Sequence, residues 1–82
     1  MNKHWILFHL HEAQEELTRT IDELESNPDY LETEFQIAMA HIYHHLNTGW
    51  NSRALDHERT ALCSEHDFDV WRSFPTDIPL GQ

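Results

Sequence analysis

The sequence predicts an all-α protein built on a long antiparallel helical hairpin, and three observations carry this prediction. Apolar residues recur at spacings of three and four over residues 6–24 and again over residues 31–46, which is the period of an amphipathic helix. A Ser-Asn-Pro-Asp run at residues 26–29 separates the two stretches with residues that cap and start helices. Because this connection is short, the two helices are expected to fold back on each other as an antiparallel pair.

Each predicted helix carries one apolar stripe. The first helix, over residues 3–26, has the stripe Ile6, Leu10, Ala13, Leu17, Ile21 and Leu24. The second helix, over residues 28–53, has the stripe Leu31, Phe35, Ala38, Ile42 and Leu46. We expect the second helix to continue through Gly49, because Trp50 extends its stripe. The two stripes are expected to meet layer by layer, with Leu17 opposite Ala38 and Ala13 opposite Ile42.

The C-terminal third contains one clear helix signal. Ser64 and Asp67 have the spacing of a capping box, and Pro75 is a stop signal, so a short helix is predicted over residues 65–73. Residues 54–63 are compatible with either a helical extension or a packed loop. We therefore expect a single helical domain over residues 1–74, followed by an extended tail over residues 75–82 that orders only if something holds it.

The size of the chain favours self-association. A domain of 82 residues buries a modest share of its surface, and the second helix carries a broad apolar arc that one neighbour cannot cover. We expect two hairpins to pair into a four-helix-bundle homodimer, with an interface that includes Trp5, Ile37, Ala40 and Trp50. Alternatively, the C-terminal segment folds back and the aromatic rings form the end of the core.

Composition excludes several classes of partner. Fifteen acidic residues against five Lys and Arg give a formal charge of −10, which repels nucleic acid and anionic membranes. No stretch approaches the roughly 20 apolar residues of a membrane span, and the apolar run near the N-terminus is too short for a signal peptide. The single cysteine, Cys63, forms no internal disulfide. We therefore expect a cytoplasmic protein.

Histidines and glutamates form the one pattern that suggests a metal site. At about 100° per residue, His41 and His45 share a flank of the second helix, whereas His44 points away. Glu12 and Glu16 lie on the flank of the first helix that faces this pair. These four residues are the predicted metal ligands, and such an oxygen and nitrogen set suits Zn²⁺, Fe²⁺ or Mn²⁺. The alternative is a set of interhelical Glu–His hydrogen bonds that needs no ligand.

No catalytic motif is complete. The Glu-x-x-His pair of carboxylate-bridged di-iron bundles is absent, and the zinc-protease motif that begins at His11 has Glu15 in place of its second histidine. Cys63 has acidic neighbours that disfavour the thiolate. The sequence names no cofactor with certainty and predicts no catalytic residue, and its charge leaves proteins as the favoured partners.

These observations predict a small, acidic, self-associating protein-interaction module without catalysis. The alternative is a metal-binding helical bundle, up to a metalloenzyme, built on the Glu/His flank. A third hypothesis is pH sensing, because eight histidines stand among fifteen acids and neighbouring carboxylates raise the pKa of imidazole.

Overall fold

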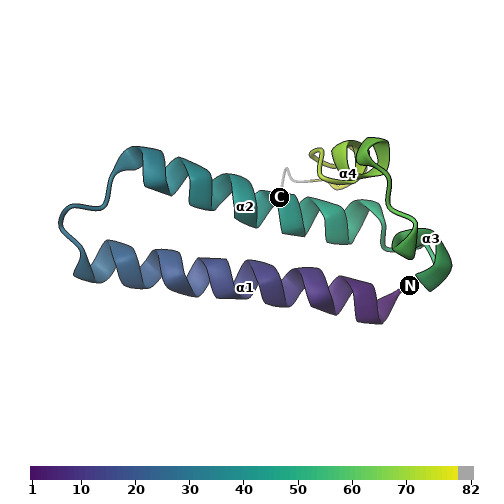
Figure 1. The fold of residues 1–82 in the computed structure, drawn as a ribbon, viewed down its shortest axis with the longest axis horizontal. Coiled ribbons are helices and arrows are strands. Elements are labelled where there is room, and N and C mark those ends of the chain that lie inside the picture. Colours follow the sequence, from purple (N-terminus) through teal and green to yellow (C-terminus); the bar gives the residue numbers. More distant parts are fainter. Residues whose placement is uncertain (80–82) are drawn as a thin grey trace.

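The computed structural model describes residues 1–79 and confirms the all-α hairpin (Figure 1). The long helices α1 (Lys3–Ser26) and α2 (Glu32–Asn51) lie side by side and antiparallel. Two short helices, α3 (His57–Ala61) and α4 (Glu65–Trp71), follow at the open end of the hairpin, near the N-terminus. The last three residues of the predicted tail over 75–82 lie outside the described residues.

The connection between the long helices is longer than predicted. α2 begins at Glu32 and not at residue 28, because Asn27 organises a turn. The Asn27 side chain accepts a hydrogen bond from the backbone N–H of Asp29, and its carbonyl accepts one from Tyr30. Pro28 therefore lies within the turn and does not start the helix. At its other end, α2 continues through Gly49 to Asn51, as expected.

Residues 54–63 contain α3, a helix that the sequence left undecided. The Asp56 side chain caps it by accepting from the backbone N–H of Arg59. The predicted capping box of α4 is present, with Ser64 and Asp67 bonded reciprocally. Arg59 also donates two hydrogen bonds of 2.7 Å to the Asp67 carboxylate, which ties α3 to α4. This guanidinium holds the pKa of Asp67 below its usual range.

Side-chain amides fasten α4 to α2. Asn47 donates to the carbonyl of Arg72, and Asn51 donates to the carbonyls of Trp71 and Ser73. These bonds satisfy carbonyls at the C-terminal end of α4 that have no partner within the helix. Trp71 is buried, with 6% of its surface exposed.

The open end of the hairpin is closed by hydrogen bonds between the two termini of the long helices. The backbone N–H of Asn2 donates to the carbonyl of Arg53 at 2.8 Å, and the Asn2 amide donates to Leu55 at 3.1 Å. Beside them, Trp5 Nε1 donates to Ser52 Oγ at 2.7 Å. The hairpin is thus held at the turn by the covalent chain and at the open end by these bonds.

The seam between α1 and α2 differs from the predicted layers. The buried seam residues are small or polar, except for Ile42; they are His9, Ala13 and Thr20 of α1 and Ala38, Ile42, His45 and Gly49 of α2. Of the predicted stripes, only Ala13, Ala38 and Ile42 are buried. Leu24 and Leu31, the stripe residues nearest the turn, are 56% and 59% exposed. The large residues of the predicted stripes therefore do not fill the seam, because the helices approach along their small residues and turn the large apolar ones to one side.

Within residues 1–79, no helix has the combination of length and apolar character needed to cross a membrane.

Candidate functional site

Four histidines meet at the seam and form what we call the histidine cluster: His9 from α1 and His41, His44 and His45 from α2. His9 Nδ1 lies 2.9 Å from His45 Nδ1, and His45 Nε2 lies 3.2 Å from His41 Nε2. His45 therefore contacts a neighbouring imidazole through each of its ring nitrogens. His9 and His45 are buried, with 5% and 8% of their surfaces exposed, whereas His41 lies at the solvent edge.

Two glutamates of α1 border the cluster, as the sequence predicts. Glu16 Oε2 lies 3.4 Å from His41 Nδ1, across the seam. Glu12 lies one turn before Glu16 on α1, and its carboxylate opposes the lowering of the His45 pKa. Of the four predicted ligands, Glu16, His41 and His45 thus form a line of contacts on one flank of the hairpin, and Glu12 follows that flank on α1. Glu16 is shared with Arg19, whose guanidinium donates to the same oxygen at 3.1 Å.

The glutamate fixes the direction of the hydrogen bonds in the cluster. An ionised carboxylate only accepts, so His41 must carry its proton on Nδ1. His41 Nε2 is then an acceptor for His45 Nε2–H, and His45 Nδ1 accepts from His9 Nδ1–H. The remaining atom of this chain, His9 Nε2, is a buried acceptor without a hydrogen-bond partner in residues 1–79.

Burial favours the neutral forms of His9, His44 and His45. Desolvation, together with the smaller effects of the nearby His45 and His44, lowers the pKa of His9 to about 4. Desolvation also lowers the pKa values of His44 and His45, although Glu12 and Glu16 act in the opposite direction on His45. The two carboxylates act on His45 in the expected direction, but its pKa is lowered overall because the cost of burying a charged imidazole dominates.

Sequence reasoning missed two members of the cluster. His44 does not point away but packs between the rings of His45 and Phe68, at centroid distances of 4.7 Å and 4.9 Å. Its Nδ1 is buried without a hydrogen-bond partner among the described residues. The involvement of His44 depends on α4, which brings Phe68 over α2. His9 lies one turn before Ala13 of the seam, and this spacing is the signal that places it there.

The cluster is not a complete metal centre as it stands. Within residues 1–79, no three His, Cys, Asp or Glu side chains form a group that could hold a metal ion. The reason is visible in the contacts of His45, whose two ring nitrogens face different neighbours. His9 and His41 therefore approach it from opposite sides and do not share a common point.

The second candidate feature is an apolar face on the other side of the seam. At about 100° per residue, large apolar side chains of each long helix project within about 80° of one another. The exposed members of this face are Leu10, Leu17, Ile21 and Leu24 of α1, Leu31 immediately before α2, and Phe35 and Leu46 of α2. Each is 38% to 59% exposed. Two adjoining grooves follow this face, and Leu10 and Leu46 line both.

The residues predicted for an interface fall in different places. Ile37 is 72% exposed but projects about 180° away from Leu46 on α2, and Ala40 projects about 120° away. Trp5 turns inward, where its ring meets Trp71 edge to face at 6.3 Å. Only Trp50 borders the apolar face, and its Nε1 donates to Asp77 at 2.8 Å. Asp77 thereby holds residues of the predicted tail against the hairpin.

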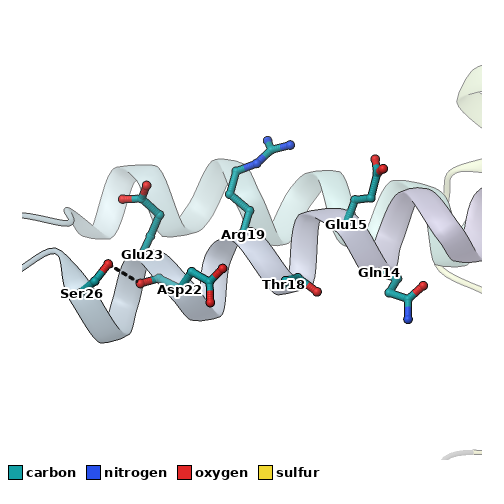
Figure 2. Close-up of a pocket in the computed structure, with 7 residues that line it drawn as sticks. All are labelled: Gln14, Glu15, Thr18, Arg19, Asp22, Glu23 and Ser26. Atoms are coloured by element: carbon teal, nitrogen blue, oxygen red, sulfur yellow. Dashed lines mark hydrogen bonds between the residues drawn. The ribbon is translucent and has the colours of Figure 1, made fainter.

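A recess on the outer side of α1 carries no chemistry of its own (Figure 2). It is lined by polar side chains of this helix alone, and these side chains project to different sides (Figure 2). The hydrogen bond drawn there, from Ser26 Oγ to the carbonyl of Asp22, belongs to the end of the helix. We therefore assign no site to it.

No family model matches this chain, and comparison with curated proteins and with solved structures also finds no match. The function must therefore be inferred from the histidine cluster and the apolar face themselves.

Proposed function

We propose that this protein is a self-associating helical hairpin, whose apolar face packs against that of a second copy to form a homodimeric four-helix bundle. The observation that carries the proposal is the length of the face, which runs from Leu10 and Leu46 to Leu24 and Leu31 at the turn. Large continuous apolar patches on soluble proteins mark interaction sites. A pair of helices that exposes such a stripe lacks the second layer of a helical domain.

The single chain has a small core, which favours a stabilising partner that is always present. Its buried apolar side chains are Ala13, Ala38, Ile42 and Trp71. Domains of this size are commonly stabilised by oligomerisation, since their own core contributes little. A second copy is available wherever the chain is made, whereas an unrelated partner is not. The exposed leucines would then complete the core that the seam leaves unfinished.

The charges beside the apolar face also suit a second copy. The middle of its border is uncharged, with Gln14, Thr18 and Gln36. Glu25 and Glu32 border it at the turn, and Lys3 borders it at the open end, where Lys3 has no ion pair within residues 1–79. Two hairpins packed head to tail would bring Lys3 of each copy to the acidic end of the other. The strongly acidic chain can thus meet itself without like charges facing across the interface.

The same head-to-tail arrangement matches the apolar layers of α1. Around a two-fold axis between Ala13 and Gln14, Leu10 of one copy lies opposite Leu17 of the other. Ile6 then lies opposite Ile21, and Lys3 falls beside Leu24 and Glu25. Such an interface is isologous, since the same patch serves both copies.

Sedimentation equilibrium of the full chain over a wide concentration range tests this proposal. We expect a monomer–dimer equilibrium with the dimer as the largest species. A strict monomer at concentrations of hundreds of micromolar would overturn the proposal. Larger open assemblies would overturn the two-fold arrangement, because a closed symmetric pair leaves no apolar face for further copies.

A further inference from the structure

The histidine cluster contains a pair of atoms with the spacing of two metal ligands. His41 Nε2 and His45 Nε2 lie 3.2 Å apart, one helical turn from each other on α2. Two imidazole nitrogens bound to one ion at about 2.0–2.1 Å are separated by roughly 3.0–3.4 Å. Histidines at positions i and i+4 of a helix are a known chelating pair. The described backbone therefore already holds the pair at the required separation.

The groups behind each imidazole suit ligation. A metal-binding histidine usually donates its other ring N–H to a carboxylate or another acceptor, which orients the ring. Glu16 Oε2 occupies this position behind His41, 3.4 Å from Nδ1. His9 Nδ1 occupies it behind His45, 2.9 Å from that ring's Nδ1. Glu16 is thus already an acceptor behind His41, and His9 Nδ1 becomes one behind His45 once the proton of His9 moves to Nε2.

We propose that His41 and His45 chelate a divalent first-row transition metal ion, Zn²⁺ foremost, through their Nε2 atoms. Glu16 orients His41, and His9 orients His45. The remaining coordination positions are filled by water. The site opens to solvent, because 51% of the His41 side chain is exposed. It lies on the opposite side of the seam from the apolar face, so it does not depend on the proposed dimer.

Metal binding requires the protons of His45 and His9 to change ring nitrogens. Without metal, His45 Nε2–H donates to His41 Nε2, and His9 Nδ1–H donates to His45 Nδ1. On binding, the proton of His45 moves from Nε2 to Nδ1 and that of His9 moves from Nδ1 to Nε2. Each histidine keeps one proton, so no net proton is released. Both Nε2 lone pairs then point at the ion, and His45 Nδ1–H donates to His9.

The choice of ion follows from the donor set. Imidazole nitrogens suit Zn²⁺, Cu²⁺ and Ni²⁺, and affinity within this series rises from Mn²⁺ and Fe²⁺ toward Cu²⁺. Mg²⁺ and Ca²⁺ prefer oxygen ligands and should not compete. Two nitrogens and solvent form an open coordination sphere, as in sites where an ion binds a further ligand.

Isothermal titration of the metal-free full chain with ZnCl₂ tests the proposal. We expect one ion per chain at this site, with no comparable binding of MgCl₂. His41→Gln should weaken Zn²⁺ binding at least tenfold, and Glu16→Gln should weaken it about tenfold by removing the group that orients His41. His11→Gln is the matched control, since His11 is an exposed histidine of α1 outside the cluster, and it should leave binding unchanged.

A second readout reports the geometry directly. In ¹⁵N–¹H correlation spectra of the imidazoles, Zn²⁺ should move the proton of His45 from Nε2 to Nδ1. Binding that survives His41→Gln unchanged would place the ion elsewhere and overturn the assignment. Absence of binding by the wild-type chain, or an unchanged His45 tautomer at saturation, would show that the histidines serve only as interhelical hydrogen bonds.

Discussion

A polar substitution at the centre of the apolar face gives the sharpest test of self-association. Leu17 is 49% exposed in the single chain. Complete burial of a leucine contributes about 1.5–3 kcal/mol, so covering its exposed half in the dimer contributes about 1 kcal/mol. Both copies carry the residue, and Leu17→Glu therefore removes about 2 kcal/mol from association. This corresponds to a Kd at least about 30-fold weaker, before the cost of burying a carboxylate is added.

The control for this variant is Ile37→Glu. Ile37 is 72% exposed and lies on the opposite side of α2, so the added charge should leave the Kd unchanged. Sedimentation equilibrium gives both constants, and far-ultraviolet circular dichroism shows that the helices are retained. The milder Leu17→Ala serves if the glutamate variant does not fold. Dissociation by Ile37→Glu with no effect of Leu17→Glu would refute our placement of the interface and favour the face predicted from the sequence.

Two further predictions concern charges. Lys3→Glu should raise the Kd of the dimer about two- to thirtyfold, since each dimer loses two surface ion pairs of about 0.2–1 kcal/mol. Adding Glu25→Lys to this variant should restore the Kd. A double variant that associates more weakly than Lys3→Glu alone would exclude the head-to-tail arrangement. The pKa of Asp67 is lowered by Arg59, so its contribution to stability is present above its unfolded pKa of about 3.9 and is lost as the pH falls toward its folded value. Asp67→Asn should therefore speed amide exchange in α3 and α4 at pH 5. The additional rise in amide exchange between pH 5 and pH 2 should be smaller in this variant than in the wild-type chain. The exposed Asp69→Asn should change neither quantity.

The sequence predicted the helices well because their signals are local. The three-and-four spacing, the Ser64–Asp67 capping box and the continuation through Gly49 each depend on residues within a few positions of one another. The start of α2 was misplaced because the Asn27 side chain competes with Pro28 for control of the turn. Such side-chain hydrogen bonds to nearby backbone are difficult to weigh from composition alone.

How the two apolar stripes pack could not be predicted from such local signals. A broad apolar arc allows two helices to rotate about their axes, and the sequence does not say which part of the arc faces the neighbour. Small residues line the contact here, because Ala13 and Ala38 are buried in the seam and Gly49 lies beside the Cβ of His9. That rotation brought His9 into the seam and turned Leu17 out of it. The expected proximity of Glu16 to His41 survived, because it depends on the register of the hairpin.

The closure of the open end has a consequence for how this molecule can move. A hairpin free at one end can slip one helix along the other by a turn, about 5.4 Å, and so exchange neighbours along the whole seam. Here the hydrogen bonds from Asn2 to Arg53 and from Trp5 to Ser52 oppose such a one-turn shift at one end of the hairpin, and the short turn opposes it at the other. The backbone register of His9 with His45 is therefore fixed, and the cluster responds to protons or ions only through ring rotations and tautomer exchange.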